Sequence, residues 1–562
     1  MPFAGRDALL TADAMREADR TTIDDVGLPG VTLMEVAGRG CAQAIADAFS
    51  PIDGRRVIIL CGKGNNGGDG LVVGRRLFQA GARVHIVLMS DPDELRDDPA
   101  HQQSLIRSLQ AESDRAGDLT TSLFDASGGI ETLAAEAAAL RPTLFVDALL
   151  GTGLTSDLRE PIYSVVGWLN EQDAPVVSLD LPTGLHSDTG QVLGDAVAAD
   201  RTITMAARKT GMVVGQGPLY TGPVDVVDIG IPDFVIERRR EAPGCARLTT
   251  DDLVADAWPE RPRNAHKYSA GMAVVVGGSP QYTGAPVLSA TAAARAGAGY
   301  VACACPDSVQ GALSAQMTTI PTHGLPYGEE GLDPDGALDV LSSVTDRAQA
   351  LLVGPGLGRK AGTEAFVHRL LADRSDDAGP PVVIDADGLN ALAGAMDELS
   401  DHANGRWILT PHAGEFRRLA GDVDLTDRVR VAQTYAERWN SVLLLKGTPS
   451  LVAAPDGRPF VGSSRRAPPR RMDAHCRGVP LQGFLQGVLF RGVADAPARR
   501  SFAPGDRSRQ VIVRARWSFA SRVRSREGAG RAAVPFPPIV PPPNLEGTGE
   551  TLAMRNRRSG RW

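Results

Sequence analysis

Residues 57–70 read VIILCGKGNNGGDG, and this stretch decides the fold of the first half of the chain. Val57–Leu60 has the length and β-branched content of a buried strand, and a helical pattern begins near Leu71. Between them lies a loop with five glycines, two asparagines and one aspartate. Such a strand, turn and helix N-terminus forms an anion site, because free backbone N–H groups and the helix dipole point at the ligand. A tight turn without a ligand is the alternative, but the NNGGD core is more than a turn requires.

The first half of the chain continues with alternating strands and helices. Helical patterns cover residues 11–25, 32–49 and 130–140. Strand-like runs lie at 56–61, Arg83–Met89, Thr143–Asp147, Pro175–Leu179, Arg201–Met205 and Val224–Val227. This alternation predicts a mostly parallel sheet with helices on both faces.

Two aspartates stand where predicted strands end. Asp147 follows the apolar run TLFV, and Asp180 follows VVSL. Both should therefore emerge at the carboxyl edge of the sheet, where open α/β sheets bind their ligands. A loop or helix cap is the structural alternative.

The motifs of residues 10–235 resemble those of the NAD(P)H-hydrate epimerase family. In the family's order, they are TLMEVAG (32–38), CGKGNNGGDG (61–70), VDALLGTGL (146–154), SLDLPTGLHSDTG (178–190), ARKTG (207–211) and GIP (230–232). The resemblance implies a Rossmann-like three-layer αβα domain that interconverts the R and S hydrates of NADH and NADPH. It assigns the hydrate to a set of loop residues, namely Asn65, Asn66, Gly67, Gly68, Asp69, Gly151, Thr152, Gly153, Leu154, Thr155, Ser156, Asp157 and Asp180.

The same resemblance implies a bound K⁺ ion at Asn66, Asp147 and Thr183. Amide, carboxylate and hydroxyl oxygens suit such an ion. Epimerisation at carbon 6 of the hydrated ring requires the hydroxyl to leave and to return from the other face, and a carboxylate can serve as its general acid and base. We assign this role to Asp180. Asp69 is the alternative, although a charge near a helix N-terminus is more typical of capping or of a phosphate loop.

Lys209, within the ARKTG motif, has two interpretations. It balances a phosphate or a carboxylate, or it is an ordinary surface lysine. The sequence leaves both open.

A second alternating unit begins near residue 250, and its motifs resemble those of the ribokinase-like NAD(P)H-hydrate dehydratases. Strands are predicted at Met272–Gly277, Tyr300–Cys305, Ala350–Gly354, Val382–Asp385, Trp407–Thr410 and Val442–Lys446. The motifs are HKYSAG (266–271), GGSPQYTGAP (277–286), RAGAGYV (295–301), GPGLG (354–358), IDADGLNAL (384–392), TPHAGEF (410–416) and LLKGTPS (444–450). The implied reaction phosphorylates the hydrate with ADP and then eliminates phosphate.

This second resemblance implies the binding residues of the dehydratase. It places the substrate at Ala285, Gly358 and His412, and ADP at Lys446, Gly447, Thr448, Pro449 and Ser450. Asp385 and Asn390 would lie near the phosphates or a divalent ion, so we expect ADP and Mg²⁺ as cofactors. A lone histidine is more often structural, and only the surrounding motif favours His412 as a ligand.

The dehydratase resemblance stops near Val461. The family's GxGD motif, which supplies an anion hole and a catalytic aspartate, should follow LLKGTPS by roughly 20–30 residues, and Gly462–Gly487 contains none. Residues 463–562 hold 20 Arg, no Lys and 6 acidic residues, for a net charge of +14, whereas residues 1–462 carry −22. The whole chain has 5 Lys against 54 Arg, which is typical of a GC-rich gene, so we interpret the tail as disordered or as a frameshift product.

These patterns predict an α/β protein of two domains. We expect an epimerase domain over residues 1–235, a polar linker over 236–248, an incomplete ribokinase-like α/β domain over 249–461, and the Arg/Pro-rich tail over 462–562. No run of 18 apolar residues and no basic, apolar leader occurs, which favours a cytoplasmic protein. The six cysteines show neither a disulfide framework nor a zinc spacing.

The expected partner is a small molecule, the NAD(P)H hydrate. The acidic body argues against nucleic acid, no membrane contact is expected, and a homo-oligomer is left open. Two other functions are weaker alternatives. One is a ribokinase-type small-molecule kinase with an accessory N-terminal domain, and the other is a non-catalytic binding or scaffold protein.

Overall fold

The computed structural model describes residues 4–124, 128–257, 263–267, 269–373 and 379–462. Its first half contains the strands β1 (Ala8–Leu10), β2 (Arg56–Cys61), β3 (Arg83–Leu88), β4 (Leu119–Leu123), β5 (Leu144–Ala148), β6 (Val176–Leu179), β7 (Arg201–Met205), β8 (Arg208–Lys209) and β9 (Val224–Val227). Its α-helices are α1 (Ala12–Arg20), α2 (Gly30–Ala48), α3 (Asn65–Gln79), α4 (Asp97–Glu112), α5 (Gly129–Leu140), α6 (Ile162–Asn170), α7 (Gly217–Tyr220) and α8 (Asp233–Arg239).

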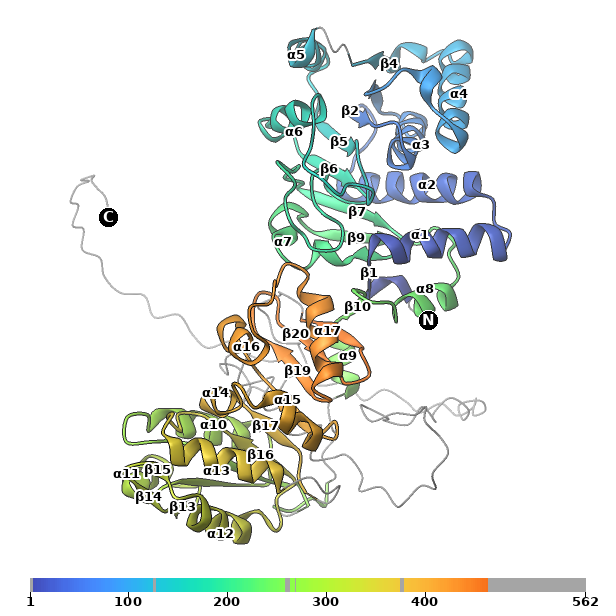
Figure 1. Ribbon diagram of the computed structural model, residues 1–562. Helices are drawn as coiled ribbons and strands as arrows, with labels where there is room; N and C mark the ends of the chain where they lie inside the picture. The colour runs from blue at the N-terminus through green and yellow to red at the C-terminus, as the bar shows by residue number, and fades with distance from the viewer. Residues whose placement is uncertain (1–3, 125–127, 258–262, 268, 374–378, 463–562) are drawn as a thin grey trace, which may run out of the picture. The chain divides into compact units, whose positions relative to one another are not determined.

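Seven parallel strands form the first sheet, in the order β4-β3-β2-β5-β6-β7-β9. Alternate residues of β2 face opposite cores: Val57 and Ile59 pack with α1–α4, and Ile58 and Leu60 pack with α5 and α6. Figure 1 shows these two groups of helices on either side of the sheet. The predicted three-layer αβα arrangement is therefore confirmed. The chain leaves β2 in one direction and returns to its other side at β5, so the sheet changes winding between these two strands.

Helix α3 begins at Asn65, six residues before the predicted start at Leu71. The expected nine-residue loop is thus reduced to Gly62–Gly64, and the remaining glycines of the motif are helical. Packing explains them. A Cβ atom at Gly67 would overlap the carbonyl oxygen of Gly62, and one at Gly70 would lie 2.6 Å from the Cβ of Ala148 on β5. Glycine lets this helix lie directly against the ends of β2 and β5.

We expect Gly67→Ala to destabilise the protein. The added methyl meets backbone, which cannot rotate away, so about 2 kcal/mol or more of stability should be lost. Gly167→Ala is the matched control, because Gly167 also lies in a helix but has no atom within 4 Å of its Cβ position. There alanine should hold or raise stability through its better helix propensity. Thermal unfolding of both variants checks this, and equal melting temperatures would contradict the packing role.

The second half contains the strands β10 (Ala246–Leu248), β11 (Met272–Val276), β12 (Tyr300–Pro306), β13 (Thr322–Leu325), β14 (Tyr327–Gly328), β15 (Gly331–Leu332), β16 (Ala350–Val353), β17 (Val382–Ile384), β18 (Trp407–Leu409), β19 (Val442–Leu445), β20 (Leu451–Ala453) and β21 (Pro459–Val461). Its α-helices are α9 (Asp251–Ala257), α10 (Gly284–Arg295), α11 (Asp307–Gln316), α12 (Pro334–Thr345), α13 (Ala361–Ala372), α14 (Asp387–Ala391), α15 (Met396–Leu399), α16 (Ala413–Ala420) and α17 (Arg428–Arg438).

The large sheet of this half runs in the order β13-β12-β11-β16-β17-β18-β19-β20-β21-β10-β1-β8. In this order, all neighbouring strands from β13 to β19 are parallel to one another. Strands β19, β20 and β21 form an antiparallel meander. Helices α12–α17 cover one face of the parallel part, and α10 and α11 cover the other. The predicted α/β architecture is confirmed here too.

The stretch 236–248, which we expected to be a polar linker, is structured. Helix α8 buries Val235 and Ile236 in the core of the first half. Strand β10 pairs with β1, with Ala246 opposite Leu9, and Cys245 beside it is fully buried. The charged ERRRE sequence hid this apolar face, because it directly follows Val235 and Ile236 at the end of one short helix.

Strand β19 lies in the core of the second half. All four residues are buried, with Leu443 and Leu445 packed in the core that α17 covers. The interpretation of residues 463–562 as disordered or out of frame lies outside the described residues. Within the described ranges, none of the helices has the length and apolarity needed to cross a bilayer.

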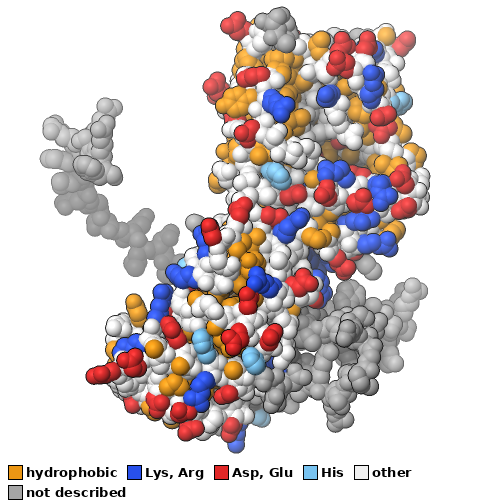
Figure 2. All heavy atoms as spheres, in the orientation of Figure 1, with side chains coloured by type: hydrophobic (Ala, Val, Ile, Leu, Met, Phe, Trp, Pro, Cys, Tyr) orange, Lys and Arg blue, Asp and Glu red, His pale blue; other side chains and the backbone are white. Residues whose placement is uncertain are grey.

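Charged side chains are spread over the surface of the described residues. Figure 2 shows acidic and basic groups interspersed on the visible face, with neither sign forming a continuous area there. This distribution gives no indication of a nucleic-acid surface on that face.

Candidate functional sites

The first candidate site lies where the sheet changes winding. The loops after β2, β5 and β6 meet there, and they carry Asn66, the 149–157 segment and Asp180, respectively. Open α/β sheets bind ligands at this kind of switch point, because two adjacent loops diverge and leave a crevice. The prediction that Asp147 and Asp180 lie at the carboxyl edge is confirmed.

Asp180 forms a buried ion pair with Lys209. The ammonium group of Lys209 donates to Asp180 Oδ1, to Thr204 Oγ1 at 2.9 Å, and to two backbone carbonyls. The Lys209 side chain is only 1% exposed and that of Asp180 is 16% exposed. The carboxylate interpretation of Lys209 is therefore correct, and the surface interpretation is wrong.

The second oxygen of Asp180 is available to a ligand. No hydrogen bond reaches its Oδ2 within the part of the chain that the structure describes. This atom lies 3.4 Å from the position that a Cβ atom on Gly151 would take, and the Cβ of Asn66 lies 3.5 Å from the same position. Asp180 adopts a φ of +62°, a strained conformation for a residue other than glycine. Strain at a carboxylate held by a buried cation is a frequent sign of a functional site.

Asp147 is buried and saturated with hydrogen bonds. Its carboxylate accepts from the backbone N–H groups of Leu149 and Thr183, from Ser178 Oγ at 2.8 Å and from Thr183 Oγ1 at 2.7 Å. Burial raises the pKa of Asp147, and these hydrogen bonds oppose the rise. Its visible role is to tie the ends of β5 and β6 together.

The donor set expected for K⁺ lies beside this network. Asn66 Nδ2 donates to the carbonyl oxygen of Leu150 at 3.0 Å, while Asn66 Oδ1 is buried without a partner. Thr183 Oγ1 lies 3.3 Å from the same carbonyl. An unpaired buried amide oxygen next to a carbonyl and a hydroxyl fits a weakly held monovalent cation.

The remaining residues predicted to bind the hydrate fall into two groups. Gly67, Gly68 and Asp69 are buried in the first turns of α3, and Asn65 is exposed at its start. Gly151, Thr152, Gly153, Leu154, Thr155, Ser156 and Asp157 form an irregular loop after β5 that is half-buried at first and exposed towards its end. The structure thus brings both segments to one edge of the sheet.

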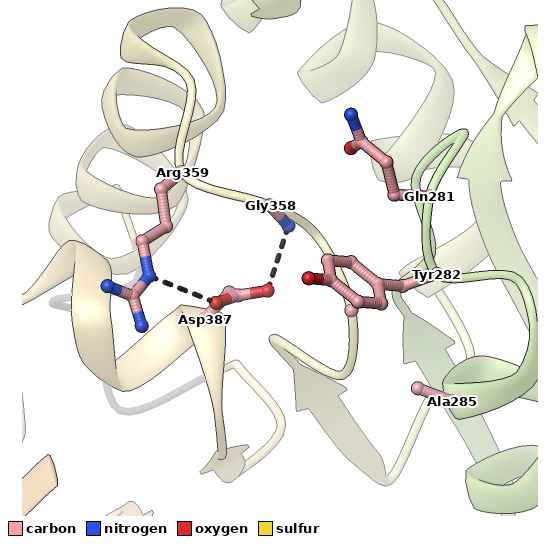
Figure 3. Close-up of a pocket in the computed structure, with 7 residues that line it drawn as sticks. Gln281, Tyr282, Ala285, Gly358, Arg359 and Asp387 are labelled. Carbon is pink, nitrogen blue, oxygen red and sulfur yellow. Dashed lines mark hydrogen bonds and ion pairs between the residues drawn. The ribbon is translucent and has the colours of Figure 1, made fainter. Parts of the chain in front are cut away.

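A second candidate site lies at the ends of β11, β16 and β17. A pocket of about 610 Å³ is lined by Gln281, Tyr282, Ala285, Gly356, Gly358, Arg359 and Asp387. Asp387 Oδ2 accepts from the Gly358 N–H at 2.9 Å, and its Oδ1 lies 3.5 Å from Arg359 Nε (Figure 3). Ala285 and Gly358, both predicted to bind substrate, line this same pocket.

His412 caps a helix and does not line that pocket. Its Nδ1 accepts from the backbone N–H groups of Gly414 and Glu415, and Glu415 returns a bond to the His412 N–H. His412 therefore has a structural role, as the N-cap of α16. About half of its side chain is exposed, so the ring can still contact a ligand.

The segment predicted to bind ADP starts in a buried charge cluster. Lys446 Nζ lies 2.8 Å from Asp385 Oδ1 and 3.5 Å from Glu415 Oε2. Gly447–Ser450 form the turn between β19 and β20, and Asn390 hydrogen-bonds to Asp387 at 3.1 Å. Within the described ranges no cluster of three or more His, Cys, Asp or Glu is placed to hold a metal ion.

Several residues of these sites escaped the sequence analysis. Asp19 on α1 interacts electrostatically with Asp180 and Lys209, and burial raises its pKa to about 6. Its one available signal was a charge next to the apolar face of an amphipathic helix. Tyr282 and Asp387 stood inside the quoted motifs GGSPQYTGAP and IDADGLNAL but were not singled out, whereas Thr204 and Arg359 lay outside the quoted motifs. Glu415 stood inside TPHAGEF, three residues after the cap, which is the spacing of a capping box.

Comparison with known proteins gives consistent matches for both halves. The family model described as YjeF-related protein N-terminus matches residues 30–211, and the model described as NAD(P)H-hydrate dehydratase matches residues 273–467. The bifunctional NAD(P)H-hydrate repair enzyme Nnr of Salinibacter ruber is 60% identical over 488 residues, which are 86% of this chain and 88% of the relative. The enzyme of the same name from Moorella thermoacetica is 38% identical over 490 residues, again 86% of this chain and 88% of the relative.

One solved structure extends the comparison. The crystal structure of the ADP/ATP-dependent NAD(P)H-hydrate dehydratase from Bacillus subtilis, crystallised with ATP and Mg²⁺, is 23% identical to this chain. The match covers 44% of this chain and 80% of that chain, with a TM-score of 0.32.

Proposed function

Because this chain belongs to the bifunctional NAD(P)H-hydrate repair enzymes, we propose that its first site interconverts the R and S hydrates and that its second is the ADP-dependent dehydratase site. The observation that carries the first part is the free Oδ2 of Asp180. It faces the Gly151 loop while Lys209 holds the other oxygen. This arrangement offers one oriented carboxylate oxygen to a ligand in a crevice.

The chemistry of the hydrate matches this carboxylate. The hydrate carries a hydroxyl on a ring carbon next to nitrogen, and its epimers interconvert when that hydroxyl leaves and water returns. A carboxylate near the carbon accelerates both steps by proton transfer. Lys209 and Thr204 Oγ1, at 3.4 Å, both donate to Asp180 Oδ1, and holding this oxygen orients Oδ2.

K⁺ would be held by Asn66 Oδ1, the Leu150 carbonyl and Thr183, with Asp147 behind them. A cation there would supply positive charge for the anionic part of the nucleotide. The protein groups themselves position the Gly151 loop, since Asn66 and Thr183 both reach the Leu150 backbone.

The proposal for the dehydratase half rests on fewer contacts. The hydrate would occupy the 610 Å³ pocket at Ala285 and Gly358, and ADP would lie along Lys446–Ser450. Lys446 at the end of β19 provides a cation for phosphate, and Asp385 and Glu415 beside it would face Mg²⁺. The absence of a GxGD motif before residue 487 leaves the phosphoryl acceptor without its base in this half.

The cellular setting follows from the chemistry. The five cysteines that the structure describes are all buried and unpaired, which suits a reducing compartment such as the cytoplasm. The proposed partner is a soluble dinucleotide, and homo-oligomerisation remains open.

We expect the 562-residue protein to equilibrate pure R hydrate with the S form well above the rate in buffer. Chromatographic separation of the epimers at intervals measures this. Replacing K⁺ with tetramethylammonium, which is too large for the Asn66 site, should lower the rate. Unchanged R hydrate in the presence of K⁺ would contradict the proposed function.

A further inference from the structure

Asp69 is a buried carboxyl group without a structural task. It is the fifth residue of α3 and is 9% exposed, yet no hydrogen bond to its carboxyl oxygens occurs among the described residues. It does not cap the helix, because the N-cap is Gly64 and no side chain makes a cap bond there. A buried carboxyl without a partner is costly, so its presence requires an explanation.

Charged and titratable groups face Asp69 from four elements. These are Asp180 after β6, Asp19 on α1, Lys209 at the end of β8 and the thiol of Cys41 on α2. Burial, and next the charges of Asp180 and Asp19, hold the pKa of Asp69 well above its usual value, with Lys209 acting in the opposite direction. Lys209 offers Asp69 no hydrogen bond, because its ammonium group is engaged by Asp180, Thr204 and two carbonyls.

Asp69 also lies on the side of α3 that faces the site. Asn66, one turn earlier, shares its face of the helix and reaches Leu150 in the loop after β5. The side chain of Asn66, whose Oδ1 has no partner, lies 3.5 Å from the Cβ position of Gly151, and the free Oδ2 of Asp180 lies 3.4 Å from the same position. The crevice therefore holds one carboxylate that is paired with a cation and one carboxyl that is not.

We propose that Asp69 is the proton donor of the epimerase site and that Asp180, oriented by its ion pair with Lys209, is the matching proton acceptor. This inference rests on the proposed epimerase function and adds a second catalytic group to it. Two carboxyls in different surroundings, one paired with a cation and one buried without a partner, are a recurrent arrangement for acid and base roles.

The step balances without any further reactant. Asp69 gives its proton to the hydroxyl oxygen, the bond from carbon 6 to oxygen breaks with its electron pair on oxygen, and water leaves. The lone pair of the ring nitrogen forms the double bond to carbon 6. A water molecule then adds to the opposite face and loses a proton to Asp180 Oδ2. Exchange with solvent returns the proton to Asp69.

The first test uses the full-length protein and Asp69→Asn, which keeps the shape of the side chain but cannot act as an acid. We expect the epimerisation rate to fall at least about 100-fold. Thermal stability at neutral pH should hold or rise, since the variant removes a desolvated acid. Asp173→Asn, at an exposed aspartate outside the site, is the control and should keep the wild-type rate.

A pH profile separates this role from a structural one. Activity requires Asp69 protonated, so the rate should fall as pH rises through its raised pKa. Asp19 is ionised above about pH 6 and helps to raise that pKa, so Asp19→Asn should move the alkaline limb to lower pH. Cysteine 41 titrates only in the alkaline range because burial raises its pKa, and Cys41→Ala should leave the limb in place.

The outcomes are distinguishable. If the wild-type protein is active, any of three results would overturn the inference. The Asp69→Asn protein could epimerise within threefold of the wild-type rate, or it could unfold at a markedly lower temperature than wild type. Asp19→Asn could also leave the alkaline limb of the pH profile where it is. An inactive wild-type protein would instead refute the proposed function, and the inference with it.

Discussion

The purified 562-residue protein, given S hydrate, ADP and Mg²⁺, should form no NADH or NADPH above the rate in buffer. The reason is chemical: the segment after β21 lacks the GxGD motif, and with it both the anion hole and the base for phosphoryl transfer. Loss of a positioned base and of backbone anion donors together lowers such rates by about 10⁴-fold or more. The increase in absorbance of the reduced nicotinamide measures the reaction directly.

A chimaera provides the control for this result. Residues 1–461 joined to the corresponding C-terminal segment of the Salinibacter relative, which is 60% identical overall, should restore ADP-dependent turnover. Substituting the aspartate of a GxGD motif in the introduced segment by asparagine should abolish it again. Strong turnover by the unaltered chain would show that another residue supplies the base, and would remove the frameshift interpretation of residues 462–562.

The second large effect is expected at the buried ion pair of the first site. Asp180→Ala should lower the epimerisation rate at least about 100-fold, as loss of a positioned acid or base does. It also leaves Lys209 buried without a counter-charge, which costs about 3–5 kcal/mol of stability for a pair this enclosed. Both the rate per folded molecule and the unfolding temperature should therefore fall.

Lys209→Met tests the other partner of the ion pair. It removes the cation and leaves Asp180 without its ion pair, so the rate should fall because the carboxylate is no longer oriented. Asp225→Ala is the matched control, since the Arg201–Asp225 pair is partly exposed and its loss should cost at most about 1 kcal/mol with no change in rate. If the Asp180→Ala protein epimerised at the wild-type rate and unfolded at the wild-type temperature, Asp180 would have no part in the mechanism.

The strands that build the two sheets were largely predictable. The runs at 56–61, Arg201–Met205 and Val224–Val227 match β2, β7 and β9 residue for residue, because each is rich in the β-branched residues that favour strands. Strand β4 was missed, since Leu119–Leu123 is a half-exposed edge strand of mixed polarity. The short strands β20 and β21 give too few residues for any period to appear.

The start of α3 and the role of its glycines were not predictable from local pattern. Glycine disfavours a helix on average, so residues 65–70 looked like a loop. Close packing of the helix on Gly62 and Ala148 overrides that propensity. Helix propensity describes the isolated chain. Part of the packing that sets the start of α3 comes from Ala148 on β5, which is distant in sequence.

For the site, the sequence indicated the right loops but not their pairings. Asp180 and Asn66 were identified from motifs, whereas the partner of Lys209 became evident only from the fold. Asp19 lies on α1, far along the chain from the motifs, and its proximity to Asp180 depends on how the first helix crosses the sheet. The assignments of individual binding residues remain predictions.

The pairing of β10 with β1 bears on how the two catalytic halves can be produced separately. Strand β1 has β8 on one side and β10 on the other, so a fragment that ends at residue 235 or 240 would leave Ala8–Leu10 with an unpaired edge. An open edge of apolar strand invites association with other chains. For recombinant work on the epimerase half, a stop codon after Leu248 keeps β1 paired on both sides and moves the open edge to β10, which pairs with β21 in the intact chain. An insoluble shorter fragment would reflect the cut and not the fold.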